Sequence, residues 1–179
     1  EEFAGAADDL ARFVLAGGKR LRPTFAWWGW RAAGGAGDPT ADPAGVLRAV
    51  SALELVQGCA LVHDDLIDDS ATRRGEPTVH ARWAARHADA AWAGDPTRFG
   101  AAVAVLLGDV ALAWADDMLH ESGLDPAALA RARPVWQAMR TEVLGGQFLD
   151  VRGHAGSDSR PETALRISPT EGVMPPSIK

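Results

Sequence analysis

The stretch from Leu61 to His80, LVHDDLIDDSATRRGEPTVH, constrains this chain more than any other. An apolar helical pattern runs into it from Val50, and four aspartates then follow within residues 64–69. Carboxylates near the C-terminal end of a helix oppose the helix macrodipole and repel one another, each effect costing roughly 0.3 kcal/mol or more. An acidic run of this kind is either simply solvated or held by a cationic partner.

Two features favour the cationic partner. Asp64 and Asp68 lie one turn apart on the same helix face, and hard carboxylate oxygens at that spacing suit Mg²⁺ shared with substrate phosphates. Basic clusters lie on both sides in the sequence: Arg73 and Arg74 follow, and GGKRLRP precedes at Gly17–Pro23. Glycines there let the backbone approach an anion just before a helix N-terminus. This layout is the one expected for binding two diphosphates, one through metal and one through basic side chains.

Length and composition narrow the class of protein. A chain of 179 residues is one domain or part of a larger one. The single cysteine, Cys59, excludes an intramolecular disulfide and fits a reducing compartment, so we expect a cytoplasmic protein. A net charge of −6 argues against nucleic-acid binding. We also expect no membrane span, because no apolar run approaches the ~20 residues that a bilayer requires.

Helix formers are abundant, β-branched residues are sparse and tyrosine is absent, which predicts an all-α chain. A break or kink is expected at Pro134, and helical periodicity disappears from Ser168 to Lys179. The predicted helices cover Glu2–Leu15, a segment starting at Pro23, Pro43–Asp68, Thr78–Trp92, Phe99–His120 and Pro126 to about Val151.

Four further residues have side chains that could take part in binding or catalysis. Gln57 lies two turns before Asp64 on nearly the same helix face, where it is either a satisfied core amide or a ligand-binding group. His80 and His87 show no paired metal-ligand spacing and are expected at the surface. Cys59 has no adjacent base in the sequence, so we expect no nucleophilic role.

The chain resembles the trans-isoprenyl diphosphate synthases of the polyprenyl synthetase family. The resemblance implies an all-α helical bundle around a central cavity, usually a homodimer, that joins an allylic diphosphate head-to-tail to isopentenyl diphosphate. The motifs that carry it are GGKRLRP (17–23), ALELVQGCALVHDDLID (52–68), RRGEPTVH (73–80), LLGDVALAWADDML (106–119) and GGQFLDV (145–151).

The resemblance also assigns roles to residues. It implies that isopentenyl diphosphate is bound by Lys19, Arg22, Gln57 and Arg74. It implies catalytic roles in the aspartate-rich motif and just after it for Asp64, Asp65, Asp68 and Arg73. Within this set Asp64 and Asp68 ligate Mg²⁺, and Arg73 holds the allylic diphosphate.

The pattern departs from the family towards the C-terminus. Residues 1–167 read as the N-terminal part of a single polyprenyl synthase domain, and residues 168–179 as an irregular tail without the second aspartate-rich motif. We therefore expect the 179 residues alone to be inactive. Two alternatives remain open: a class I terpene cyclase, and a non-catalytic module for diphosphate binding or subunit interaction.

Product length is the last expectation. In the family, bulky residues five and four positions before the first aspartate stop chain growth, and this chain has the small Cys59 and Ala60 there. We expect both side chains to face the cavity, and geranylgeranyl diphosphate to be the product.

Overall fold

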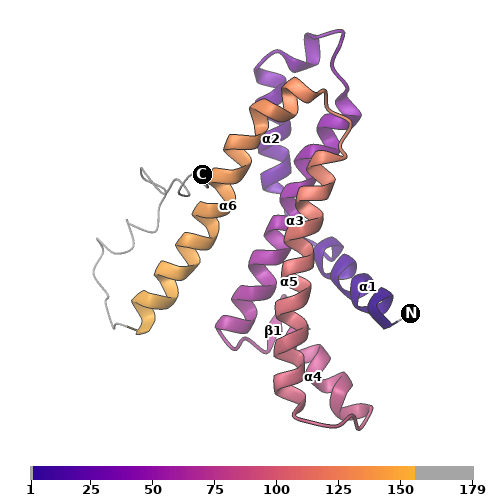
Figure 1. Ribbon diagram of the computed structural model, residues 1–179, viewed down its shortest axis with the longest axis vertical. Helices are drawn as coiled ribbons and strands as arrows, with labels where there is room; N and C mark the ends of the chain where they lie inside the picture. The colour runs from indigo at the N-terminus through magenta and orange to yellow at the C-terminus, as the bar shows by residue number, and fades with distance from the viewer. Residues whose placement is uncertain (1, 156–179) are drawn as a thin grey trace, which may run out of the picture. The chain divides into compact units, whose positions relative to one another are not determined.

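The structure, a computed structural model, describes residues 2–155, and this part of the chain is helical apart from one short hairpin (Figure 1). The all-α class is thus confirmed. In chain order the elements are α1 (Glu2–Leu15), α2 (Leu21–Ala32), the 3-10 turn η1 (Gly35–Gly37), α3 (Pro43–Ile67), β1 (Thr72–Arg73), β2 (Glu76–Pro77), α4 (Val79–Asp89), α5 (Pro96–His120) and α6 (Pro126–Ala155). The chain divides into one compact unit, Glu1–Leu124, and a second, Asp125–Lys179, whose described part is α6. The irregular tail expected over 168–179 lies outside the described residues.

The predicted helix boundaries agree closely with α1 and α3, and less closely elsewhere. α3 ends at Ile67, with Asp68 as its C-cap rather than its last residue. α2 begins at Leu21, before Pro23, and α4 is shorter than predicted. α5 begins at Pro96 instead of Phe99.

Aspartate followed by proline starts three of these helices. The Asp42 carboxylate accepts a hydrogen bond from the Ala44 N–H at 3.0 Å, and Asp95 accepts one from the Arg98 N–H at 2.8 Å. Asp125 likewise accepts from two N–H groups at the start of α6. Proline suits the first helical turn because the N–H it lacks has no partner there. The early start of α5 therefore follows from the Asp95-Pro96 pair.

Of the break or kink expected at Pro134, the break does not occur, because α6 continues through it as one helix of 30 residues. Proline removes one backbone hydrogen bond and crowds the preceding turn. The residues on both sides are mostly strong helix formers such as alanine, arginine and leucine, whose propensity opposes a break. Propensity summed over the segment outweighs the local signal.

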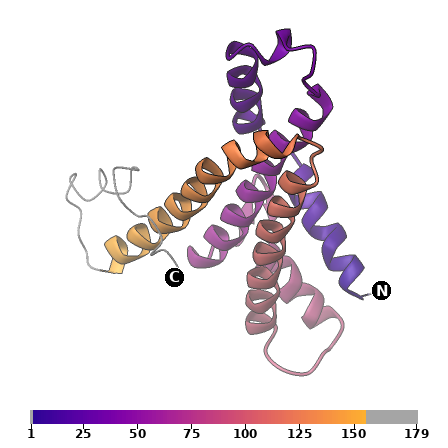
Figure 2. The same cartoon turned by 45° about the horizontal axis from the view of Figure 1, so that its top comes forward.

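The core of the first unit lies where α3 and α5 pack along each other, with α4 against α5 and α1 against both (Figures 1 and 2). Small residues on α5 let the helices approach closely: a Cβ at Gly108 would lie 2.0 Å from Nε2 of His63 on α3. Packing this tight positions the end of α3 and the loops beside it. The buried cluster consists of Leu10, Cys59, Val62, Val79, Trp83, Ala104, Leu107 and Ala111.

Both histidines expected at the surface are buried. His87 packs against Phe99, with ring centroids 5.0 Å apart, and its Nε2 lies 3.2 Å from the Ala93 carbonyl oxygen. Nδ1 of His80 lies 3.3 Å from Oγ1 of Thr78. The prediction was wrong because His80, Trp83 and His87 share the buried face of α4. Their spacing of three and four residues in the sequence already indicates a common helix face.

Two helices, α3 and α5, are long and apolar enough to cross a membrane by length and composition, with mean hydropathies of 1.5 and 1.6. Core helices of soluble proteins meet the same criterion. Here the two helices pack against each other, and α3 carries the polar residues Glu54, Gln57 and Asp64. The length and composition of these two helices are therefore weak evidence for a transmembrane helix.

Gly100 tests the packing of α4 on α5. A Cβ at this position would lie 2.2 Å from the His80 carbonyl oxygen, a backbone atom that cannot move aside alone. We expect Gly100→Ala to lower the free energy of unfolding by about 2 kcal/mol, because overpacking outweighs the gain in helix propensity. Gly5→Ala in α1 is the control, since nothing lies within 4 Å of its Cβ position. It should gain about 0.5–1 kcal/mol, and chemical denaturation measures both. Equal stability of the two variants would contradict this packing.

Candidate functional site: an acidic helix end beside a basic pocket

The three predicted acidic residues lie at the C-terminal end of α3 in different environments. Asp65 is buried, with 1% of its surface exposed, whereas Asp64 is half-buried and Asp68 is exposed at the C-cap. The helix is regular through this region, so Asp64 and Asp68 share a face as predicted and Asp65 points away from it. Asp64 and Asp68 therefore share the more accessible face, whereas Asp65 lies inside the fold.

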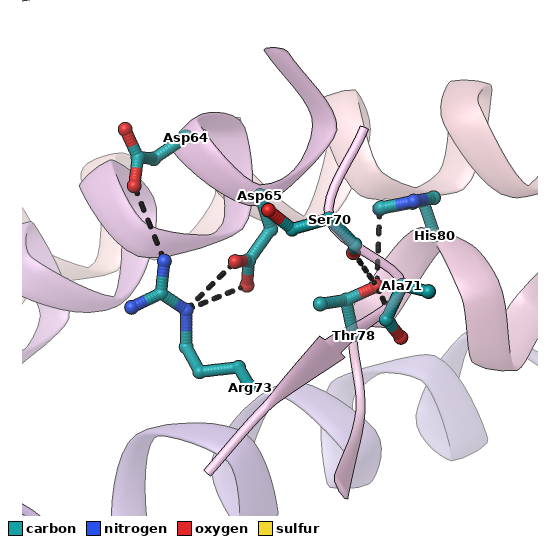
Figure 3. A network of polar contacts seen from close by, with 7 residues as sticks. All are labelled: Asp64, Asp65, Ser70, Ala71, Arg73, Thr78 and His80. Atoms are coloured by element: carbon teal, nitrogen blue, oxygen red, sulfur yellow. Dashed lines mark hydrogen bonds and ion pairs between the residues drawn. The ribbon is translucent and has the colours of Figure 1, made fainter. Parts of the chain in front are cut away.

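Arg73 holds both Asp64 and Asp65 (Figure 3). Its Nε donates to the two carboxylate oxygens of Asp65 at 2.7 and 2.9 Å, and its Nη2 donates to Oδ2 of Asp64 at 3.1 Å. The cationic partner expected for the acidic run is thus found, eight and nine residues along the chain. The contact joins the end of α3 to strand β1.

Burial raises the pKa of Asp65 above its ordinary value, and the hydrogen bonds and charge of Arg73 only partly offset this effect. A carboxyl group with a raised pKa in the folded state stabilises the fold most when it is protonated. The ionised form is therefore tolerated here because Arg73 is present.

The β1–β2 hairpin turns at Arg74 and Gly75, with Arg73 paired to Glu76 across it. Both turn residues have positive φ, 54° for Arg74 and 82° for Gly75, the combination that a type I′ hairpin turn requires. Glycine adopts this conformation freely, whereas arginine does so at a cost of roughly 1–2 kcal/mol. Backbone strain of this kind is typical of a residue retained for its side chain.

The side chain of Arg74 lies over the two glycines of GGKRLRP. A Cβ on Gly17 would be 3.4 Å from Nη1 of Arg74, and one on Gly18 would be 3.5 Å from Nη2. Both glycines also have φ values, +125° and +100°, that other residues rarely adopt. Glycine is therefore favoured here by the backbone conformation, while Arg74 lies at ordinary van der Waals distance from both Cβ positions.

Arg20 fixes this loop from the other side. Its guanidinium donates to the carbonyl oxygens of Val14 and Leu15, at 2.9 and 3.1 Å, and pairs with Glu54 on α3. These bonds satisfy the C-terminal carbonyls of α1 and tie them to α3. Arg20 is thus the structural arginine of the motif. Sequence reasoning missed the pair, although Glu54 lies three residues before Gln57 on the same apolar helix.

A cavity of about 240 Å³ opens between this loop, α3 and the hairpin. All four residues expected to bind isopentenyl diphosphate line it, from three segments of the chain: Lys19, Arg22, Gln57 and Arg74. Gly17 and Gly18 also line it, as do Arg20 and Glu54. The structure therefore brings these three cations and an amide to the wall of one pocket, which suits an anion.

The predicted metal residues are not preorganised as a cluster. Within residues 2–155, no three histidine, cysteine or acidic side chains are grouped so as to hold a metal ion. The donor chemistry still fits, because Mg²⁺ is usually bound by one or two carboxylates together with substrate phosphates and water. Asp64 and Asp68 meet that requirement as a pair.

The surroundings of Cys59 differ from those expected. A base is present, since Nδ1 of His63 lies 3.8 Å from the sulfur. Burial, together with the charge of Asp109, raises the pKa of the Cys59 thiol to about 11. A raised pKa disfavours the thiolate, the nucleophilic form, so the absence of a nucleophilic role stays a prediction.

The first unit is thus all-α and places a pocket suited to an anion near the end of α3, where Asp64 and Asp68 share one face. The chain matches the polyprenyl synthetase family over residues 6–168, and it belongs to that family. The resemblance and the fold expected from it are thus confirmed.

Three relatives illustrate the match. Over 77% of this chain, it is 36% identical to the short chain isoprenyl diphosphate synthase of Methanothermobacter thermautotrophicus. Over a further alignment that also covers 77% of this chain, it is 33% identical to the geranylgeranyl diphosphate synthase of Methanosarcina mazei. A solved structure of the geranylgeranyl pyrophosphate synthase of Corynebacterium glutamicum, in complex with isoprenyl diphosphate and magnesium, is also similar. The superposition covers 93% of this chain, with a TM-score of 0.91 and 47% sequence identity. The chain spans only 35% and 36% of the two curated relatives and 47% of the solved chain.

Arg73→Ala tests the contact between Arg73 and Asp65 at the C-terminal end of α3. It should leave the Asp65 carboxylate buried without its partner and lower the free energy of unfolding by about 3 kcal/mol at pH 8. The loss should be smaller at pH 4, because Asp65, whose pKa is already raised, then becomes protonated and needs no cation. Denaturation curves at the two pH values measure this, with Arg74→Asn as control because asparagine tolerates its positive φ. A loss that does not grow with pH would contradict this role of Arg73.

Proposed function

We propose that this chain forms the isopentenyl-binding part of a prenyltransferase that condenses an allylic diphosphate with isopentenyl diphosphate, making a polyprenyl diphosphate of geranylgeranyl length. One observation carries the proposal: side chains from three separate segments line one anion-sized pocket next to the acidic end of α3. The names of the relatives point to the same reaction.

The pocket residues have distinct roles in this proposal. Lys19 supplies a compact charge to the diphosphate of isopentenyl diphosphate, while Arg22 and Arg74 supply planar pairs of N–H donors. Gln57 adds a neutral donor from α3. The loop glycines allow the backbone to come close, and the Arg20–Glu54 pair holds the loop in place.

At the acidic end, Asp64 and Asp68 would hold Mg²⁺, which when bound stabilises the negative charge of a departing diphosphate. Arg73 would contact the allylic diphosphate, as the resemblance implies. The structure supports a positioning role for it first, because its guanidinium is bonded to Asp64 and Asp65. Apolar side chains around the site would exclude water from the carbocation that forms.

The terpene cyclase and the non-catalytic module are separated from this proposal by one experiment. The full-length protein is incubated with an allylic diphosphate, labelled isopentenyl diphosphate and Mg²⁺. An elongated diphosphate is expected, since a cyclase needs no pocket for a second diphosphate. A hydrocarbon or alcohol made without isopentenyl diphosphate would indicate the cyclase, and no turnover would indicate the module.

A homodimer in the cytoplasm is part of the proposal. Large apolar side chains stay exposed on α5, and they suit a subunit contact: Val105, Leu106, Trp114 and Met118. The buried, protonated Cys59 is compatible with a reducing compartment.

The metal-binding role of Asp64 and Asp68 predicts a large loss of activity without a loss of folding. Asp64→Asn and Asp68→Asn should each lower kcat about 100-fold or more, because several kcal/mol of charge stabilisation depend on the metal. Asp69→Asn is the matched control: it removes the adjacent charge and keeps a residue that tolerates the φ of 50° at this position. Steady-state kinetics at saturating Mg²⁺ measure all three variants. Near-normal turnover of either Asp64→Asn or Asp68→Asn would show that the metal lies elsewhere.

Of the two residues expected at the floor of the product cavity, Ala60 offers the cleaner test. Cys59 is 3% exposed and packs in the α3–α5 core, where a larger side chain would overpack its neighbours. Ala60 is half-buried and lies one turn before Asp64 on the same face.

Ala60→Phe should therefore shorten the product towards farnesyl diphosphate with the fold intact. Cys59→Phe should instead destabilise the fold by about 1–3 kcal/mol through overpacking. Chromatography of the products and thermal unfolding distinguish the two variants. An unchanged product from a folded Ala60→Phe enzyme would place the floor on another element.

A further inference from the structure

A second, larger cavity of about 410 Å³ lies between α1, the hairpin and the start of α4, within the first unit. Its volume falls in the ordinary range of small-molecule sites, roughly 300–1,000 Å³. The roles proposed above use only part of its wall. The lining contains four arginines from three elements, Arg12, Arg73, Arg74 and Arg82, with Glu76 as the one acidic residue among them.

The arginines differ in what already holds them. Arg12 pairs with Asp9, and Arg73 with Asp64 and Asp65, and none of these three aspartates lines the cavity. Arg74 and Arg82 pair with no carboxylate in the described part of the chain, and Arg82 donates to the Pro77 carbonyl oxygen at 3.3 Å. These bonds use only some of the five N–H donors of each guanidinium. Arginines around one cavity repel one another, which an entering anion relieves.

We propose that this arginine cavity is a second anion site, which binds a diphosphate group. Planar guanidinium groups on several sides match the oxygens of a diphosphate better than a single negative charge. Phe13, Ala16, Leu61 and Pro77 add apolar surface to the wall, so the cavity suits both inorganic diphosphate and a diphosphate with a short prenyl tail. Binding of the anion does not depend on the function proposed above.

The cavity shares part of its wall with the pocket assigned to isopentenyl diphosphate. Phe13, Leu61 and Arg74 line both. A guanidinium drawn into one cavity is less available to the other, so we expect the two sites to weaken each other. This coupling rests on the proposed function, since it gives the second site a means of lowering the affinity for isopentenyl diphosphate when diphosphate accumulates.

Isothermal titration of the full-length protein with inorganic diphosphate, in EDTA to remove metal, tests the site without turnover. Two binding sites are expected. Arg12→Gln and Arg82→Gln should each weaken one of them about tenfold, and Lys19→Gln should weaken the other. Arg86→Gln is the control, because Arg86 lies one turn from Arg82 on α4 and does not line the cavity. It removes the same charge and should bind like the wild type.

A single site in the wild type, or Arg12→Gln and Arg82→Gln variants that bind like Arg86→Gln, would overturn the proposal. Circular dichroism checks that each variant is folded, and Arg82→Gln alone decides the matter if Arg12→Gln loses its fold with the Asp9 pair. A second titration uses a five-carbon prenyl diphosphate. Tighter binding at the Arg82-sensitive site identifies a prenyl ester as the ligand, and equal binding identifies the inorganic anion. Loss of synthase activity alone leaves these binding results unchanged, so the two proposals fail separately.

Discussion

The contact between Arg73 and the buried Asp65 is the interaction on which the rest of the site depends. It fixes the hairpin against the end of α3, and the next residue, Arg74, is thereby carried to the glycine loop. A buried carboxylate without a partner is unfavourable by several kcal/mol. The folded state therefore holds the hairpin in one position, and that position joins the acidic and basic halves of the site.

The same region carries backbone strain in a pattern that agrees with binding. Arg20, Asp69 and Arg74 all have positive φ values although none is glycine. Each lies at a junction beside the site: the start of α2, the end of α3 and the tip of the hairpin. A positive φ at a residue other than glycine lowers the stability of the fold, so it is typical of a residue whose side chain has a role. The role of Arg20 is structural, because its side chain joins α1 to α3. For Arg74 we infer that the role is anion binding.

Helical periodicity predicted the helices, because it is a property of the sequence itself. The four residues of the basic pocket were named by the resemblance to the family. The direction of individual side chains was harder to predict. Cys59 and Ala60 are neighbours, and only the packing of α3 on α5 decides that the first lies in the core. The Arg20–Glu54 pair joins residues that lie 34 positions apart, so no local signal reveals it. His87 was misplaced because histidine is polar, although the aromatic rings of Trp92 and Phe99 surround it.

The central claim is that the pocket beside the acidic helix end holds isopentenyl diphosphate. A crystal structure of the full-length protein with Mg²⁺, isopentenyl diphosphate and an unreactive thio analogue of the allylic diphosphate tests it most directly. The account predicts the isopentenyl diphosphate group within hydrogen-bond distance of Lys19, Arg22 and Arg74, with metal on Asp64 and Asp68. Isopentenyl diphosphate bound away from these cations, with the pocket filled by solvent, would contradict it.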